Sequence, residues 1–95
     1  MDKIEAENLL NNSRDKIDKI DNQILDLILE RTSLAEDIIT SKKALNKDLF
    51  DPSREEIIHN KILDAVKDKE INAEKVIKVF DLLASISKEE QEKYL

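Results

Sequence analysis

The sequence predicts an all-α protein with three helices, the first of them very long. Its 95 residues include no Gly and a single Pro, a composition typical of helical proteins. Apolar residues recur at helical intervals over roughly eight turns, at Leu10, Ile17, Ile20, Ile24, Leu27, Leu34 and Ile38. A helix of roughly 36 residues would be ~54 Å long, about twice the ~26 Å diameter of a compact domain of this size. It therefore needs a partner, and we expect residues 1–95 to form one domain of a symmetric homodimer.

Composition and charge exclude several classes of protein. The formal net charge of −6 argues against nucleic-acid binding, which needs a basic face. Without cysteine there is no disulfide framework and no thiolate metal site, and the carboxylates show no metal-ligand spacing with His59, the only histidine, which we expect at the surface. No segment has the ~20 apolar residues of a membrane span, and the N-terminus does not resemble a signal peptide. We therefore expect a cytoplasmic location with no membrane partner.

The first predicted helix ends at about Leu45, and its beginning is less well defined. Residues 1–8 are polar, so we expect them to fray. The helix begins no later than Arg14, because the good N-cap residues Asn11, Asn12 and Ser13 precede it. Neither Gly nor Pro interrupts it, so we expect a continuous helix. Asn46 can then adopt the left-handed conformation that terminates a helix.

Two further helices follow. Asp51 and Pro52 are typical of a helix N-terminus, and the helix that they start carries an apolar face made by Ile58, Ile62, Ala65 and Val66. A break at 68–71 precedes Asn72, which can cap the third helix. The face of this last helix begins with apolar side chains and becomes polar in its last turns, through Val76, Phe80, Leu83, Ser87, Gln91 and Tyr94.

The most informative residues are polar ones that occupy or border faces expected to be buried. They are Arg14, Arg31, Lys42, Asp51, Arg54, Glu55, Ser87 and Gln91. A buried charge is costly unless it is paired, and fixed cations suit a small ligand with carboxylate or phosphate groups. Arg31 and Lys42 point within about 20° of each other, ~16 Å apart along the helix, whereas Arg14 is ~25 Å from Arg31. We therefore expect Arg14 to serve a site completed by another subunit.

Each of these residues also has a purely structural interpretation. Arg14 and Arg31 would pair with acids across a coiled-coil seam, and Lys42 would be a solvated cation near a helix end. Asp51 has a sufficient role as a cap, and Arg54 with Glu55 would form a surface ion pair of little energetic value. Ser87 and Gln91 would belong to a helix end that frays into solvent.

Taken in order, these positions resemble the all-helical chorismate mutase family. The resemblance covers nearly the whole chain, from about Leu9 to Gln91, without insertion or deletion between the motifs. Its motifs are Arg14, Ile17-Asp18-x-Ile20-Asp21, Glu30-Arg31, Leu34-Ala35, Lys42, Asp51-Pro52-Ser53-Arg54-Glu55, Phe80, Ser87 and Gln91. The departure is Asp48-Leu49-Phe50, which stands where a proline and a small apolar residue are common in the family.

The resemblance implies an intertwined homodimeric helical bundle with two sites shared between subunits, and a rearrangement of chorismate to prephenate that needs no cofactor. It implies that Arg31 of one chain and Arg14 of the other hold the two substrate carboxylates. Lys42 and Gln91 would contact the ether oxygen, and Lys42 also a carboxylate.

The remaining residues complete the implied site. Glu55 and the backbone at Asp51 would take the ring hydroxyl of the substrate, while Arg54 and Ser87 would complete the carboxylate pocket. Two alternatives stay open at this point. One is an isochorismate–pyruvate lyase on the same scaffold, and the other is a dimeric coiled-coil interaction module with no small ligand.

Overall fold

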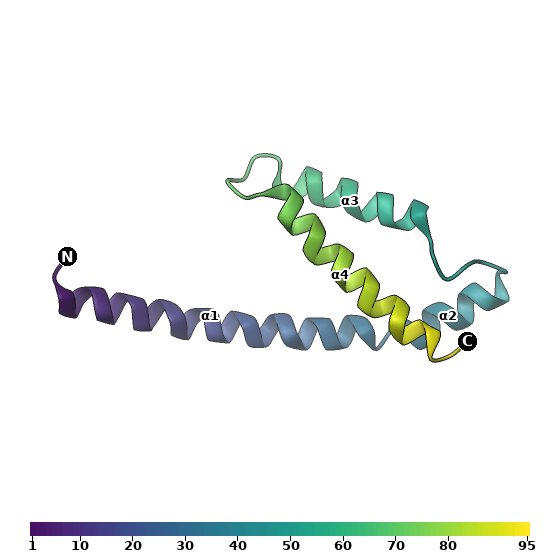
Figure 1. Ribbon diagram of the computed structural model, residues 1–95, viewed down its shortest axis with the longest axis horizontal. Coiled ribbons are helices and arrows are strands. Elements are labelled where there is room, and N and C mark those ends of the chain that lie inside the picture. Colours follow the sequence, from purple (N-terminus) through teal and green to yellow (C-terminus); the bar gives the residue numbers. More distant parts are fainter. The chain divides into compact units, whose positions relative to one another are not determined.

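The computed structural model describes all 95 residues and is entirely helical, as predicted (Figure 1). Its helices are α1 (Lys3–Thr32), α2 (Ala35–Ala44), α3 (Pro52–Val66) and α4 (Ala73–Glu92). The chain divides into two units, Met1–Glu30 and Arg31–Leu95. None of the four helices combines the length and the apolar character needed to cross a bilayer.

The first unit consists of most of α1, which begins at Lys3, well before Arg14. Its N-terminus is capped by Asp2, whose side chain accepts a hydrogen bond of 2.8 Å from the Glu5 backbone N–H. An acid followed three residues later by Glu is the sequence pattern of a capping box. This cap places the start of the helix within the segment 1–8. Fraying of that segment stays a prediction.

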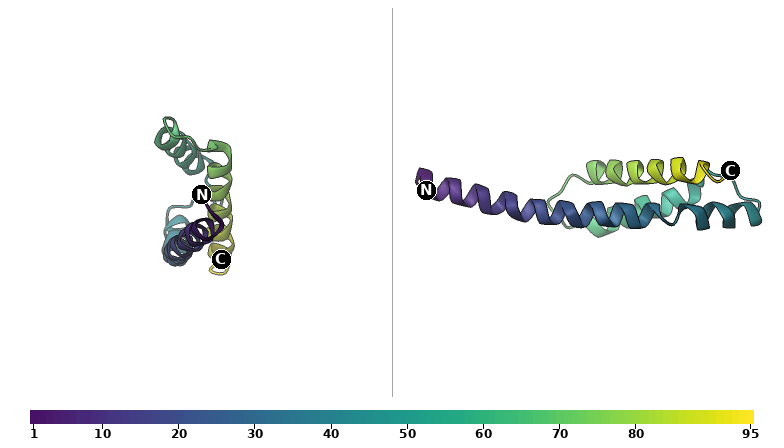
Figure 2. Two further views of the ribbon diagram at one scale, coloured as in Figure 1. Left: turned by 90° about the vertical axis from the view of Figure 1, so that its left-hand side faces the viewer. Right: turned by 90° about the horizontal axis from the view of Figure 1, so that it is seen from below.

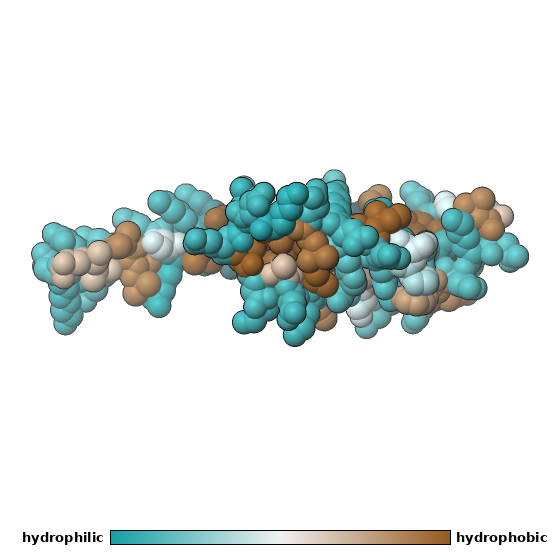
Figure 3. Space-filling model, turned by 90° about the horizontal axis from the view of Figure 1, so that it is seen from above, coloured by the Kyte–Doolittle hydropathy of each residue, from teal (hydrophilic) through white to brown (hydrophobic).

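The apolar stripe of α1 is open to solvent in the single chain. No residue of α1 is buried, and Ile17, Ile20 and Ile24 are each about half exposed. A lone helix cannot bury an apolar face without a second layer to pack against. Figure 3 shows, on one face of the molecule, apolar side chains at the surface among hydrophilic ones.

A two-residue turn at Ser33 and Leu34 separates α1 from α2, so the expectation of an uninterrupted first helix is wrong in this detail. The Leu34 N–H bonds the Arg31 carbonyl at 3.3 Å, a tighter 3₁₀-type turn. Thr32 and Ser33 carry hydroxyls that compete with helical backbone bonds. Leu34 keeps helical angles (φ −82°, ψ −5°), so α1 and α2 together realise the long first helix of the prediction.

The helix α2 ends as predicted, at an asparagine in the left-handed conformation. Asn46 has φ 56°, and its N–H bonds the Lys43 carbonyl at 3.2 Å while the Lys47 N–H bonds the Lys42 carbonyl at 2.8 Å. These two bonds are the Schellman pair that satisfies the last carbonyls of a helix. In a chain without glycine, Asn is the residue best able to adopt this conformation.

The second unit contains α2, α3 and α4, and α4 packs against both other helices (Figures 1 and 2). The predicted caps are confirmed: Asp51 accepts a hydrogen bond from the Arg54 N–H, and Asn72 accepts one from the Lys75 N–H, both at 3.1 Å. Each cap satisfies a backbone donor that the first helical turn leaves without a partner.

The buried apolar core of this unit is small and consists of Ala35, Ile39 and Ile62. Ile62 belongs to the predicted face of α3. On α2, however, the buried residues are one position beyond the predicted Leu34 and Ile38, which remain partly open to solvent. The adjacent stripe of α2, rather than the continuation of the α1 stripe, therefore supplies its buried apolar residues.

We predict that Asn72→Ala lowers the free energy of unfolding by about 1 kcal/mol, the usual value of an N-cap. The cause is the loss of the acceptor for the Lys75 N–H at the start of α4. Urea unfolding followed by circular dichroism measures the change. Asn72→Ser keeps a capping oxygen and is the matched control, so equal destabilisation by both substitutions would contradict the role of the cap.

Candidate functional site

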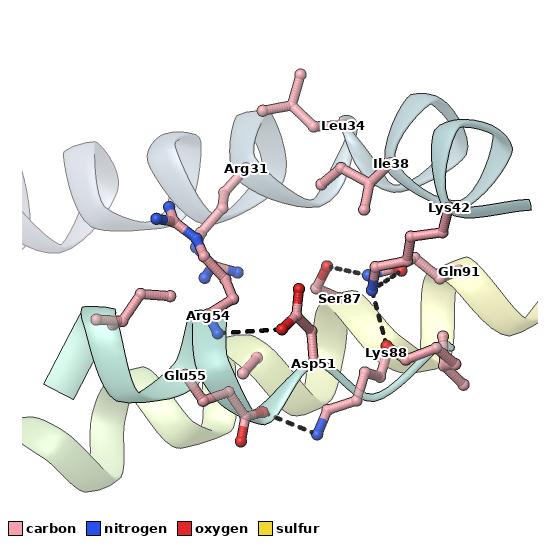
Figure 4. Close-up of a pocket in the computed structure, with 13 residues that line it drawn as sticks. Arg31, Leu34, Ile38, Lys42, Asp51, Arg54, Glu55, Ser87, Lys88 and Gln91 are labelled. Carbon is pink, nitrogen blue, oxygen red and sulfur yellow. Dashed lines mark hydrogen bonds and ion pairs between the residues drawn. The ribbon is translucent and has the colours of Figure 1, made fainter. Parts of the chain in front are cut away.

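The second unit contains a cavity of about 480 Å³, a volume typical of small-molecule sites. Helices α2, α3 and α4, the end of α1 and the connection before α3 contribute to its wall (Figure 4). Seven of the eight polar residues that the sequence singled out line it, namely Arg31, Lys42, Asp51, Arg54, Glu55, Ser87 and Gln91. Five apolar residues and Lys88 complete the lining: Leu34, Ile38, Leu49, Ile58, Ala84 and Lys88.

Lys42 is held at the cavity by two hydrogen bonds. Its ammonium donates to the Leu49 carbonyl at 2.7 Å and to the Gln91 side-chain oxygen Oε1 at 2.9 Å. An ammonium has three N–H donors and no acceptor. The geometry therefore fixes the direction of the side chain and leaves a third donor for a ligand. It also fixes the orientation of the Gln91 amide, because only the amide oxygen can face a lysine.

Gln91 and Ser87 are the two buried polar residues of the protein, and both belong to this network. Gln91 is only 3% exposed, and its Nε2 donates to Ser87 Oγ at 2.9 Å. No buried side-chain nitrogen or oxygen lacks a hydrogen-bond partner. One N–H of the Gln91 amide remains beyond its bond to Ser87, so the network can still present a donor. The two residues do not belong to a fraying helix end.

The arginines occupy another part of the cavity. Arg31 Nη1 donates to the Leu83 carbonyl at 3.1 Å, which ties this partly buried side chain to α4. Figure 4 shows Arg31 and Arg54 extending toward one another, while Lys42 and Gln91 lie together at the other end. Neither Arg31, Arg54 nor Lys42 forms an ion pair with an acidic side chain. These three cations are therefore available to an anionic ligand.

Asp51 combines its capping role with a place in the cavity wall. Its Oδ1 accepts hydrogen bonds from the Ser53 hydroxyl at 2.8 Å and from the Arg54 N–H at 3.1 Å. These two bonds, with smaller contributions from the positive charges of Lys47 and Lys42, hold the pKa of Asp51 below its usual value of 3.8. Asp51 is therefore an ionised acceptor at neutral pH.

Sequence reasoning missed Lys88, which lies beside the predicted Glu55. The Lys88 ammonium is 3.0 Å from Glu55 Oε1, and it also lies over the ring of Phe50, 4.7 Å from the centroid. One signal existed in the sequence: Lys88 follows Phe80 and Ala84 in steps of four residues, so it shares their helix face. The predicted face of this helix follows the neighbouring row through Ser87 instead.

The charge of the cavity opposes the charge of the whole protein. Four cations and two carboxylates line it, so the cations exceed the carboxylates by two, whereas the chain has a net charge of −6. This excess matches a small molecule with two carboxylates. With oriented lysine and glutamine donors at one end, the cavity can bind such a dianion and stabilise negative charge that develops on it.

Two residues considered in the sequence lie elsewhere. Arg14 belongs to the first unit, while every residue that lines the cavity belongs to the second. His59 is partly exposed, as expected, and its Nε2 lies 2.6 Å from Asp81 Oδ1.

Comparisons with known proteins agree with this chemistry. A family model described as chorismate mutase type II matches residues 13–92. The chain is 42% identical over 82 residues to the chorismate mutase of Methanocaldococcus jannaschii, an alignment that covers 86% of this chain and 83% of the relative. No solved structure matches the chain.

The lowered pKa of Asp51 predicts an acid-dependent weakening of the cap of α3. A depressed pKa means that the stabilisation is present above pH 3.8 and is lost as pH falls through the lower pKa of the folded state. Asp51→Asn keeps a capping oxygen but cannot titrate. We expect the difference in melting temperature between the parent and this variant to be constant at neutral pH and to shrink on acidification below about pH 5. A difference independent of pH would contradict the assignment.

Proposed function

Because the chain belongs to the chorismate mutase type II family, we propose that the cavity bounded by α2, α3 and α4 is where it converts chorismate to prephenate. The chain is thus an isomerase of aromatic amino acid biosynthesis. Membership of this family favours chorismate mutase activity over the two alternatives, the isochorismate–pyruvate lyase and the coiled-coil interaction module. The observation that carries the location is the oriented Lys42–Gln91 pair in a cavity whose cations exceed its acids.

The reaction is a rearrangement within one molecule. The ether carbon–oxygen bond breaks while a new carbon–carbon bond forms, and no atom is gained or lost. The breaking bond lengthens before the new one is complete, so negative charge builds on the ether oxygen. Catalysis then requires a fixed substrate conformation and donors aimed at that oxygen. It requires neither a nucleophile nor a cofactor.

Lys42 and Gln91 are the proposed donors to the ether oxygen. The bond between them at 2.9 Å, together with the bonds to Leu49 and Ser87, holds both side chains before substrate arrives. Donors that are already oriented need little reorganisation as charge develops. They therefore stabilise the transition state more than the ground state, which is the condition for raising kcat.

Arg31 is proposed to hold one substrate carboxylate, and Arg54 to complete the carboxylate pocket. Arg31 and Arg54 carry planar guanidinium groups that suit bidentate binding, and neither is paired with an acid of the chain. Ser87 completes this part of the pocket. At the ring hydroxyl, Glu55 and the backbone at Asp51 act as partners, since both lie in the cavity wall.

The proposed active form is a homodimer in which Arg14 of the partner subunit binds the second carboxylate. Two features support this assembly. The apolar stripe of α1 is open to solvent in the single chain, and two such helices can bury their stripes against each other. Arg14 interrupts the same stripe, so it would be carried toward the second chain.

We predict that Lys42→Ala lowers kcat by about a hundred- to a thousandfold, the usual loss when one oriented donor is removed. The fall in chorismate absorbance measures turnover, and circular dichroism verifies that the variant remains helical. Lys43→Ala is the matched control, because Lys43 is the neighbouring lysine but bonds the Tyr94 carbonyl and does not line the cavity. A Lys42→Ala enzyme within tenfold of the parent would falsify this role.

We predict that Arg14→Ala and Arg31→Ala are each nearly inactive alone but regain activity when mixed under conditions of subunit exchange. A heterodimer of the two variants carries one cavity with both arginines intact and one with neither. Up to a quarter of the parent activity per chain is expected, since random exchange makes half of the dimers heterodimers. Absence of recovery, with heterodimers demonstrated by native mass spectrometry, would contradict a shared site.

A further inference from the structure

Lys88 joins three elements at the edge of the cavity. It belongs to α4, its ammonium is 3.0 Å from Oε1 of Glu55 on α3, and the same ammonium lies 4.7 Å from the ring centroid of Phe50 in the preceding connection. The side chains of Lys88 and Glu55 are 32% and 29% exposed. Bulk solvent therefore reaches this ion pair only in part, and it keeps more of its strength than a surface pair does.

Among the cations of the cavity, Lys88 alone forms an ion pair with an acid of the protein. Its partner, Glu55, presents a problem to any dianionic substrate, because an ionised carboxylate at the cavity wall repels it. Lys88 offsets that charge without removing the carboxylate as an acceptor. The bond occupies Oε1, and a carboxylate has a second oxygen able to accept a hydrogen bond.

Phe50 keeps the ammonium of Lys88 in place. A lysine over an aromatic face is attracted by the negative charge of the ring face, and this contact favours the position beside Glu55 over the solvent. The Leu49 carbonyl, one residue earlier, accepts the bond from Lys42. Neighbouring residues of one connection thus contact both lysines of the cavity. Phe50 also lies in the segment where the sequence departs from the family resemblance.

We propose that Lys88 is a positioning residue for the reaction and acts through Glu55. It fixes the Glu55 carboxylate so that the free carboxylate oxygen accepts a hydrogen bond from the ring hydroxyl of chorismate. It also reduces the repulsion between that carboxylate and the dianionic substrate. This inference rests on the proposed function, because it requires substrate to bind in this cavity. The proposal requires no contact between Lys88 and the carboxylates or the ether oxygen of the substrate.

A double-mutant cycle with Lys88→Met and Glu55→Gln tests the proposal. Lys88→Met keeps much of the side-chain length and removes the charge. We expect kcat/KM to fall about tenfold, the size appropriate to a partly screened, charge-assisted hydrogen bond, and to fall chiefly through KM. In the Glu55→Gln background the same substitution should change little, because residues that act as one unit are non-additive. Lys88→Arg retains the charge and should restore most of the loss.

Lys93→Met is the matched control, since Lys93 follows α4, pairs with Glu90 at 2.8 Å and does not line the cavity. Circular dichroism of every variant verifies folding. Multiplying effects in the double variant would show that Lys88 acts independently of Glu55 and would overturn the proposal, as would unchanged kcat/KM in Lys88→Met. Activity of Lys42→Ala near that of the parent is a different failure, because it would overturn the location of the active site itself.

Discussion

The hydrogen bond between Lys42 and Gln91 is the interaction on which the rest of the cavity depends. It joins α2 to α4 across 49 residues of sequence, and it involves the most buried polar side chain of the protein. The buried amide oxygen of Gln91 needs a donor, which the Lys42 ammonium supplies. The network extends to Ser87 on one side and to the Leu49 carbonyl on the other. One set of bonds thus holds the wall together and orients the donors proposed for the ether oxygen.

Around this bond the protein keeps several cations without acidic partners. A conventional core would exclude such charges or neutralise them, because their desolvation is costly. Here they are half-buried or exposed at the edge of an open cavity, so water solvates them until an anion replaces it. Only three apolar residues are buried in the second unit, namely Ala35, Ile39 and Ile62.

Much of this arrangement is predictable from sequence because local chemistry determines it. Asn46, Asp51 and Asn72 each end or begin a helix through bonds to residues within five positions, so their roles follow from residue type and order. The polar positions of the site lie on helix faces that periodicity identifies, and three such faces brought together form the cavity. The cap of α1 is equally local, since Asp2 and Glu5 together have the pattern of a helix N-terminus.

What the sequence did not reveal depends on contacts between elements. The burial of Ile39 instead of Ile38 depends on how other helices pack against α2, and helical periodicity cannot give that packing. The ion pair of Lys88 is not predictable from local sequence, because its partners, Glu55 and Phe50, are more than 30 residues away. The turn at Ser33 lacks the glycine or proline that would have marked it, and the competing hydroxyls are a weak signal.

The uncovered stripe of α1 has a consequence beyond the site. In the proposed dimer, the apolar surface that a single chain exposes to solvent is buried only when two chains associate. Folding and dimerisation would then be one coupled, bimolecular process. The melting temperature would rise with protein concentration, and extreme dilution would inactivate the enzyme by dissociating the dimer.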